Sequence, residues 1–372
     1  MLTLLAPLAP HAQSVTVETV VDAGSQIDDG LAIGPDGALY GSRFGGFPAP
    51  VGTTVTRVDP ATGATSVHAS GFQRANGLAF GPDGSLYVAN YNTGAITRVT
   101  PDGTQSTLAQ ANTTVSGLAY DSQNDRLYVA SYDGGWVRYV SSTGTLIPVV
   151  SGLDSPAGLA FDDQNRLHVA NFENGTIYRI SGTTATLFAD VRTAVGFLAF
   201  GGGQFYATGI RSHRLYTISA SGDVTRLAGT GAIGTVDGPG GSARFNRPNG
   251  IVATANGDTL YVSDAGSRAV RRIILAAPTA ADETPEALGT DVRVSPNPAT
   301  GEARMEYRLG APAEVDVALY DSLGRRIRTV VQGLQSSGTH QVGIDVSDLA
   351  SGVYVVSVAV EGRLESRRLV VP

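Results

Sequence analysis

Three glycines in the segment AGTGAIGTVDGPGGSARFNRPNGI, residues 228–251, have the G-x-G-x-x-G spacing that binds a dinucleotide pyrophosphate. They are Gly229, Gly231 and Gly234. The motif works where it follows a strand and opens a helix, because the unpaired N–H groups of the first helical turn hold the phosphate. Here more glycine, a proline and the hairpin-like run NGIVATANGDTLYVSD follow instead. The pattern therefore argues against a nucleotide site.

The composition narrows the remaining chemistry. The 372 residues include no Cys and no Lys, so all 26 basic residues are Arg. Thiol nucleophiles, disulfides, Cys-ligated metals and Schiff-base lysines are thereby excluded, and any catalysis must use Ser, Thr, Tyr, His or carboxylates. The net charge of -7 works against attraction to phosphate backbones, so no nucleic-acid partner is expected.

Three oxygen-bearing side chains stand directly before glycines of a recurring motif. They are Asp29, Asn76 and Asn249. Carboxylate and amide oxygens are ligands that calcium prefers, so the trio forms a candidate calcium site if the fold brings it together. The alternative is structural, because Asn and Asp are favoured at turns where their side chains bond to nearby backbone. Both interpretations stay open at this stage.

A second candidate set follows the second strand of each motif copy. In four copies an aromatic residue comes next, and four rings on one face would form a platform for a sugar, a peptide or another planar ligand. The alternative is that the rings only pack between neighbouring sheets. A histidine in GIRSHRLY is placed on the same face, as a general base or as a solvated loop residue. The candidate ligand-binding residues are Arg43, Phe44, Asn90, Tyr91, Tyr132, Asn171, Phe172, His213 and Asp264.

A repeat positions these residues. The phrase NGLAFGPDGSLYVANYNTGAITRVTPDGTQSTLA, from Asn76 onward, has weaker copies along the chain. Each copy reads as four short antiparallel strands, and the opening glycines Gly30, Gly77, Gly117, Gly158, Gly196 and Gly250 indicate six copies. This predicts an all-β fold with a six-bladed β-propeller. The sixth copy lacks a fourth strand, and we expect SVTVETVVD at the N-terminus, residues 14–22, to complete that blade.

The sixth copy, AGTGAIGTVDGPGGSARFNRPNGI followed by LYVSDAGSRAVRRI, resembles an NHL repeat. The other copies resemble NHL or gluconolactonase-type, regucalcin-like propellers, and the resemblance covers about residues 14–275. It implies that the glycine-rich segment is the crossing from blade five to blade six, with Phe245 as its apolar plug. In the gluconolactonase family a divalent ion is held by a Glu of the first blade and by Asn, Asn and Asp of later blades, the Asp serving as base. At the later positions this chain has Ser116, Ala157 and Val195, and only Asp29 occupies a comparable place. The resemblance therefore does not carry lactonase activity over.

The C-terminal part reads as a separate domain. AAPTAADETPEALGT, residues 276–290, suits an extended linker. Residues 291–372 alternate apolar and polar residues between turns, which predicts a small immunoglobulin-like β-sandwich. The series SPNP, VALYDSLGRRI and DLASGVYVVSV resembles the type A C-terminal sorting domain of the type IX secretion system. The resemblance implies export across a bacterial outer membrane and recognition by that machinery, with an ordinary adhesion or spacer domain as the alternative.

The N-terminal run MLTLLAPLAPHAQ, residues 1–13, is typical of the apolar region and cleavage site of a secretory signal, although it has no positive flank. No transmembrane segment is expected. The sequence therefore predicts a monomeric protein that is secreted or held at the outer-membrane surface of a Gram-negative bacterium. We expect a binding module for an extracellular glycan, peptide or protein. The alternative is a calcium-dependent, gluconolactonase-like hydrolase or lyase acting on a small lactone or ester.

Overall fold

The computed structural model describes residues 14–45, 52–276, 292–309, 312–321, 325–360 and 363–372. The chain divides into two compact units, Met1–Ala277 and Pro278–Pro372. Within the described ranges the regular elements are strands, apart from one short 3-10 helix, η1 (Ala23–Ser25). The predicted signal segment 1–13, and all but the first residue of the predicted linker, lie outside the described residues.

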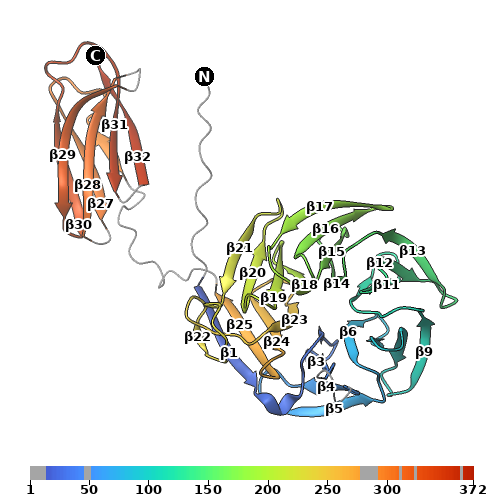
Figure 1. Cartoon of the computed structure of the whole chain (residues 1–372). Coiled ribbons are helices and arrows are strands. Elements are labelled where there is room, and N and C mark those ends of the chain that lie inside the picture. The colour runs from blue at the N-terminus through green and yellow to red at the C-terminus, as the bar shows by residue number, and fades with distance from the viewer. Residues whose placement is uncertain (1–13, 46–51, 277–291, 310–311, 322–324, 361–362) are drawn as a thin grey trace. The chain divides into compact units, whose positions relative to one another are not determined.

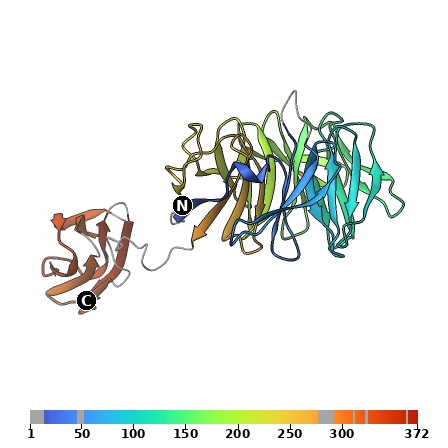
Figure 2. The same ribbon diagram turned by 90° about the horizontal axis from the view of Figure 1, so that it is seen from below.

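The N-terminal unit is built from six antiparallel sheets, here called blades 1 to 6, arranged radially around an axis (Figure 1; Figure 2 shows the unit turned by 90°). This arrangement is consistent with a β-propeller. Five blades have four strands in chain order. They are β2 (Leu31–Ile33), β3 (Leu39–Ser42), β4 (Thr54–Val58) and β5 (Thr65–Ser70) in blade 1; β6 (Ala75–Phe80), β7 (Leu86–Asn90), β8 (Ala95–Val99) and β9 (Gln105–Gln110) in blade 2; β10 (Leu118–Asp121), β11 (Arg126–Ser131), β12 (Trp136–Val140) and β13 (Leu146–Ser151) in blade 3; β14 (Pro156–Phe161), β15 (Leu167–Asn171), β16 (Thr176–Ser181) and β17 (Thr184–Asp190) in blade 4; and β18 (Val195–Gly201), β19 (Gln204–Gly209), β20 (Arg214–Ile218) and β21 (Val224–Ala228) in blade 5.

Blade 6 combines segments from both ends of the unit. Its sheet order is β22 (Gly238–Pro239), β1 (Ser14–Val21), β25 (Ala269–Ala276), β24 (Thr259–Asp264) and β23 (Pro248–Ala253). In the register, Val17 of β1 lies opposite Ile273 of β25 on one side and Gly238 on the other. The N-terminal strand therefore completes the last blade, which confirms the predicted closure. The glycine-rich segment turns back to add β22 as a fifth strand, a pairing that the sequence reasoning did not anticipate.

Burial along each blade follows the apolar pattern of its sequence. In blade 2 every residue of β7 is buried, whereas most residues of the outer strand β9 are exposed. Continuous apolar strands are covered on both faces by the neighbouring blades, and alternating strands have one face in water. The inner strands therefore form the rigid part of each blade, from which the connecting loops project.

The glycine that opens each repeat allows the blades to approach one another around the axis. A Cβ on Gly117 would lie 1.8 Å from the carbonyl oxygen of Ala157 in blade 4, and a Cβ on Gly250 would lie 2.1 Å from that of Asp29 in blade 1. Contacts this short are impossible for any larger residue. Hydroxyl groups reinforce the same contacts: Ser263 of blade 6 donates to the Asp29 carbonyl at 2.6 Å. The repeated glycine is therefore a packing requirement, which explains its regular spacing.

The C-terminal unit consists of two antiparallel sheets. The apolar residues of both sheets form one core, which includes Met305, Tyr307, Val317, Ile344 and Val356. One sheet has the order β26 (Arg293–Ser295), β27 (Glu302–Leu309), β30 (Gly338–Asp345), and the other has the order β29 (Arg326–Gln335), β28 (Ala313–Tyr320), β31 (Gly352–Val360), β32 (Arg363–Val371).

Candidate functional site

A cavity of about 660 Å³, here called the mouth cavity, opens among the loops of the N-terminal unit. Its walls come from the crossings that enter each innermost strand and from the loops between the second and third strands. These are the two loop sets in which the sequence placed the candidate site. The mouth cavity is lined by Asp28, Asp29, Phe44, Gly45, Asn76, Tyr91, Ser116, Tyr132, Ala157, Phe172, Phe197, Ile210, Arg247, Asn249, Ala265, Gly266 and Arg268.

Four aromatic residues form one continuous wall of the mouth cavity, here called the aromatic arc. Phe44, Tyr91, Tyr132 and Phe172 come from blades 1 to 4; Phe44 lies two residues after the end of β3, and each of the others directly follows the second strand of its blade. Neighbouring ring centroids lie 5.1, 6.1 and 5.7 Å apart, with interplanar angles of 70°, 60° and 66°. These edge-to-face and tilted geometries are favourable for aromatic pairs. The rings therefore support one another in a fixed row that borders the cavity.

Charged groups hold the two ends of the arc. The Arg74 guanidinium lies 4.9 Å from the Phe44 ring centroid, and that of Arg211 lies 6.0 Å from the Phe172 centroid. Glu173 accepts a hydrogen bond from the Tyr132 hydroxyl at 2.8 Å and pairs with Arg211 at 2.7 Å. Burial, followed by the Glu173 carboxylate, raises the pKa of Tyr132 to about 12. Tyr132 therefore stays a neutral hydroxyl and cannot serve as an anionic base near neutral pH.

The predicted trio meets on the blade 6 to blade 2 side of the cavity. Nδ2 of Asn249 donates to Oδ1 of Asp29 at 3.1 Å, and Nδ2 of Asn76 donates to Oδ2 of the same carboxylate at 3.2 Å. Only 4% of Asp29 is exposed. Burial first, and then the neighbouring Asp28 carboxylate, raise the pKa of Asp29 well above its usual value. The three predicted residues, from three adjacent blades, therefore do lie together, as two amide donors around one buried acid.

The trio does not fit a divalent cation in this arrangement. Both oxygens of Asp29 already accept hydrogen bonds, because Asn76 and Asn249 turn their N–H groups, and not their oxygens, toward this carboxyl group. The adjacent crossings add Ser116, whose hydroxyl donates to the Pro156 carbonyl, and Ala157, which has no donor atom in its side chain. Nowhere in the described ranges do three His, Asp or Glu side chains gather at metal-binding separations.

Asp28 was not among the predicted residues, although it adjoins Asp29. Its Oδ1 accepts the backbone N–H groups of Phe44 at 2.6 Å and Gly45 at 3.3 Å. Burial raises the pKa of Asp28, while those N–H groups and the positive charge of Arg268 act against the shift. Asp28 therefore anchors the first ring of the aromatic arc. The signal for Asp28 in the sequence was the pair of adjacent acids, Asp28 and Asp29, directly before the opening glycine Gly30.

Several predicted ligand-binding residues lie behind the cavity wall. Asn90 is buried, accepts the backbone N–H of Gln73 at 2.9 Å and donates to Thr97. Asn171 is buried and donates to the Thr176 hydroxyl. These side chains hold the turns that carry the rings. This is the structural role that polar residues often take at turns, and their direct contact with a ligand stays a prediction.

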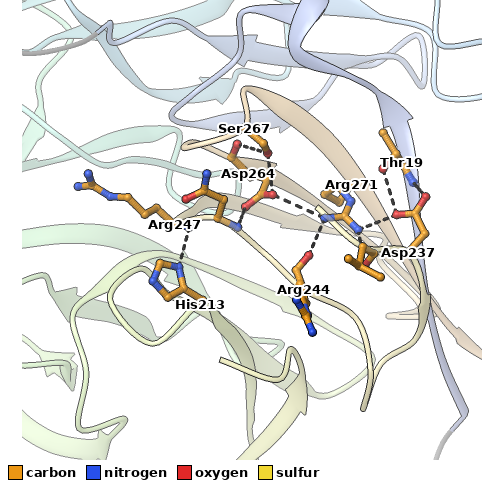
Figure 3. Close-up of polar contacts among 10 residues, drawn as sticks. Thr19, His213, Asp237, Arg244, Arg247, Asp264, Ser267 and Arg271 are labelled. Atoms are coloured by element: carbon orange, nitrogen blue, oxygen red, sulfur yellow. Dashed lines mark hydrogen bonds and ion pairs between the residues drawn. The ribbon is translucent and has the colours of Figure 1, made fainter. Parts of the chain in front are cut away.

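The other three predicted residues also lie outside the cavity lining. Asp264 is buried and accepts the Asn246 backbone N–H at 2.6 Å and the Ser267 hydroxyl at 2.7 Å, as Figure 3 shows. His213 accepts the backbone N–H of Arg247 through Nδ1 at 3.0 Å. Arg43 is half-buried. Arg247 and Arg268, by contrast, line the cavity and were missed, although Arg247 stands three residues before its opening glycine, as Arg74 does.

Comparison with known proteins gives the family. Residues 11–221 match the model of the SMP-30/gluconolactonase/LRE-like region, and residues 293–372 match the secretion system C-terminal sorting domain. No curated protein matches the chain. No helix in the described ranges is long and apolar enough to cross a membrane. The sorting domain indicates export by the type IX system, to the cell surface or into the medium.

Solved structures with a similar fold come from several bacteria. An auxiliary nutrient binding protein from Bacteroides thetaiotaomicron is 18% identical, with 70% of this chain and 76% of that chain covered and a TM-score of 0.60. An auxiliary nutrient binding protein from Bacteroides ovatus is 17% identical, with 71% and 78% covered and a TM-score of 0.61. A PQQ-bound aldose sugar dehydrogenase from Streptomyces coelicolor is 19% identical, with 72% and 99% covered and a TM-score of 0.54. At these identities the likeness shows the fold alone. The chain belongs to the SMP-30/gluconolactonase/LRE-like family and carries a type IX sorting domain at its C-terminal end.

Proposed function

We propose that this protein is an exported binding module that takes a saccharide into the mouth cavity. The N-terminal unit is then a six-bladed β-propeller with its ligand at the loop face. The C-terminal unit is an immunoglobulin-like β-sandwich that the type IX machinery recognises. The sequence predicted a glycan, a peptide or a protein as the ligand, and this proposal selects the glycan.

The aromatic arc is the observation that carries the proposal. Four rings from successive blades border one cavity, and their mutual contacts fix them before any ligand arrives. A wall ordered in advance costs little conformational entropy on binding. Sugar rings present flat C–H faces that pack on aromatic rings, while their hydroxyl groups need polar partners. The mouth cavity offers polar side chains in its lining, among them Asn249 and Arg247.

The two Bacteroides structures support this choice, since both are described as auxiliary nutrient binding proteins. A surface-exported protein that captures a nutrient needs a preformed, solvent-accessible cavity rather than a sealed active site. Two observations favour binding over the enzymatic alternative. Its buried acid is occupied by two amide donors, and His213 lies outside its lining.

Replacing one ring of the arc tests the proposal. We expect Tyr91→Ala to weaken binding of oligosaccharides by about tenfold or more, measured by isothermal titration calorimetry against a panel of neutral and acidic oligosaccharides and short peptides. Tyr139→Ala is the matched control, because Tyr139 lies on β12, outside the cavity lining, and packs against Tyr128 and Arg126. Both variants should keep the β-rich circular dichroism spectrum of the wild type.

The panel also separates the ligand classes. Binding of peptides but of no saccharide, with loss in Tyr91→Ala, would contradict the saccharide while keeping the cavity as the site. Saccharide binding that Tyr91→Ala and Tyr139→Ala weaken equally would contradict the arc as the contact surface.

A further inference from the structure

The aromatic arc does not continue around the whole mouth cavity. At the position of the ring, blade 5 has Ile210 and blade 6 has Ala265. On the blade 6 side two arginines, Arg247 and Arg268, line the cavity instead. The cavity therefore has an aromatic side and a cationic side, in a chain whose net charge is -7. Such a division orients a ligand that has one apolar face and one charged end.

The two carboxylates of the cavity leave the guanidinium of Arg247 unpaired. Asp29 is held by Asn76 and Asn249, and its raised pKa favours the neutral acid. Asp28 accepts hydrogen bonds from the backbone N–H groups of Phe44 and Gly45. Within the described residues neither acid forms an ion pair with Arg247. The charge of Arg268 acts on Asp28, and its guanidinium donates to the Gln26 side chain at 3.2 Å.

Among the described residues, Arg247 is the cavity arginine whose guanidinium has no partner. Its backbone is fixed, since the N–H donates to Nδ1 of His213 at 3.0 Å and the carbonyl accepts the Ala265 N–H at 3.3 Å. Its guanidinium makes no hydrogen bond or ion pair with any residue in the described ranges, and the residue is exposed. Figure 3 shows its side chain extending away from His213 and from the neighbouring polar network.

The backbone at Arg247 is also strained. Its φ of 58° lies in the left-handed region, directly before Pro248. A non-glycine residue in this region costs of order 1 kcal/mol and persists where the surrounding structure holds it. The same left-handed conformation occurs at Arg74, Ser155 and Arg192 in the crossings that enter other blades, so it is a repeated feature of this crossing that fixes the path of the backbone. Here it brings an unpaired guanidinium to the cavity wall on a loop tied by two backbone hydrogen bonds.

We propose that the saccharide taken by the mouth cavity is acidic, and that its carboxylate pairs with Arg247 while its ring packs on the aromatic arc. This inference rests on the proposed function. A planar guanidinium binds a carboxylate through two parallel N–H···O hydrogen bonds, which sets both the affinity and the orientation of the ligand. One unpaired guanidinium matches the single charge of a uronic acid. A phosphate dianion would add repulsion from Asp28 without a second free cation.

The test compares galacturonic acid, which carries one carboxylate, with its uncharged methyl ester, both titrated into the full chain by calorimetry at low ionic strength. We expect the wild type to bind the acid about tenfold more tightly than the ester. Arg247→Gln should lower the affinity for the acid to that for the ester and leave the ester unchanged. Added salt should weaken only the binding of the acid, because it screens the ion pair.

Arg192→Gln is the matched control. Arg192 has the same left-handed backbone, with φ of 59°, in the crossing that enters blade 5, but it does not line the mouth cavity. It should bind both ligands as the wild type does. Equal wild-type affinity for acid and ester, or an affinity for the acid that Arg247→Gln does not change, overturns the charge inference and leaves the saccharide site standing. If the wild type binds neither ligand, this inference is overturned. If it also binds no oligosaccharide of the panel, the proposed function is overturned as well.

Discussion

Arg271 and Asp237 join strands from opposite ends of the N-terminal unit. Nη2 of Arg271 on β25 lies 2.6 Å from Oδ1 of Asp237, and the same carboxylate accepts the backbone N–H and the hydroxyl of Thr19 on β1 (Figure 3). Arg271 is fully buried, and its Nη1 lies 3.6 Å from the buried Asp264. One guanidinium thus connects the glycine-rich segment, the closing strand and the turn behind the mouth cavity.

Removing this cation should destabilise the protein strongly. Arg271→Met leaves Asp264 buried without its ion-pair partner, and we expect the free energy of unfolding to fall by about 3–5 kcal/mol. Arg272→Met is the control, because Arg272 is the next residue on β25 and pairs with Glu18 of β1 at 2.5 Å, but both side chains are partly exposed. It should cost at most about 1 kcal/mol. Urea unfolding compares the two, and equal losses would show that Arg271 is not a structural centre.

A methyl group on an opening glycine should disrupt the contact between two blades. Gly117→Ala places its Cβ against the Ala157 carbonyl oxygen, a backbone atom that cannot rotate away. The blades must separate, and we expect a loss of about 1–3 kcal/mol, the usual cost of overpacking. Gly241→Ala is the control, since a Cβ there meets no atom within 4 Å. Thermal unfolding should show a lower midpoint for Gly117→Ala alone; a similar fall in both variants would count against the ring of glycines.

The features that could be predicted from the sequence are those that repeat. The opening glycines fixed the number of copies, since each glycine answers the same steric need in every blade, and the unpaired edge of β25 called for a strand such as Ser14–Val21. The aromatic residue after each second strand likewise marked the cavity wall, because its loop recurs on the same face.

The remaining features depend on individual contacts. Asn90 and Asp264 have the residue types of a binding site, but they bond to backbone N–H groups in turns, and the same chemistry serves both roles. Arg271 lies in the run AVRRIIL, where its position alone does not tell burial from exposure. Its burial follows from the return of the glycine-rich segment to β1, a long-range pairing without a repeated pattern.

His168 should make stability depend on pH in acid. It is fully buried on β15 between the Phe188 and Phe205 rings, and burial lowers its pKa from 6.5 to about 4. Between pH 6.5 and 4 the His168 imidazole therefore binds a proton in the unfolded chain but not in the folded protein. The free energy of unfolding consequently falls as the pH falls. The loss should approach about 3 kcal/mol across this window.

The same position holds Tyr87 and Tyr128 in blades 2 and 3, so an aromatic replacement of His168 suits the site. Urea unfolding at several pH values should show that His168→Phe has a smaller slope of stability against pH between 6.5 and 4 than the wild type. The difference between the two slopes cancels the contributions of the acids with raised pKa values, which act in the opposite direction. Parallel slopes would show that His168 is protonated in the folded state.

Calcium should leave the thermal midpoint of the protein unchanged. A ligand that binds only the folded state raises the midpoint by mass action, so excess calcium followed by a chelator reveals a bound ion directly. We expect no shift, because Asp29 is a single acid whose oxygens already accept hydrogen bonds from Asn76 and Asn249.

Asp29→Asn should melt at or above the wild-type temperature at neutral pH, since it removes a carboxyl group that burial holds against ionisation. Asp83→Asn is the control, because Asp83 is exposed and its pKa is lowered by the Ser85 N–H and by Arg98. A calcium-dependent rise in the thermal midpoint that is lost in Asp29→Asn and kept in Asp83→Asn would instead establish the trio as a cation site. It would then favour the calcium-dependent hydrolase or lyase over the binding module.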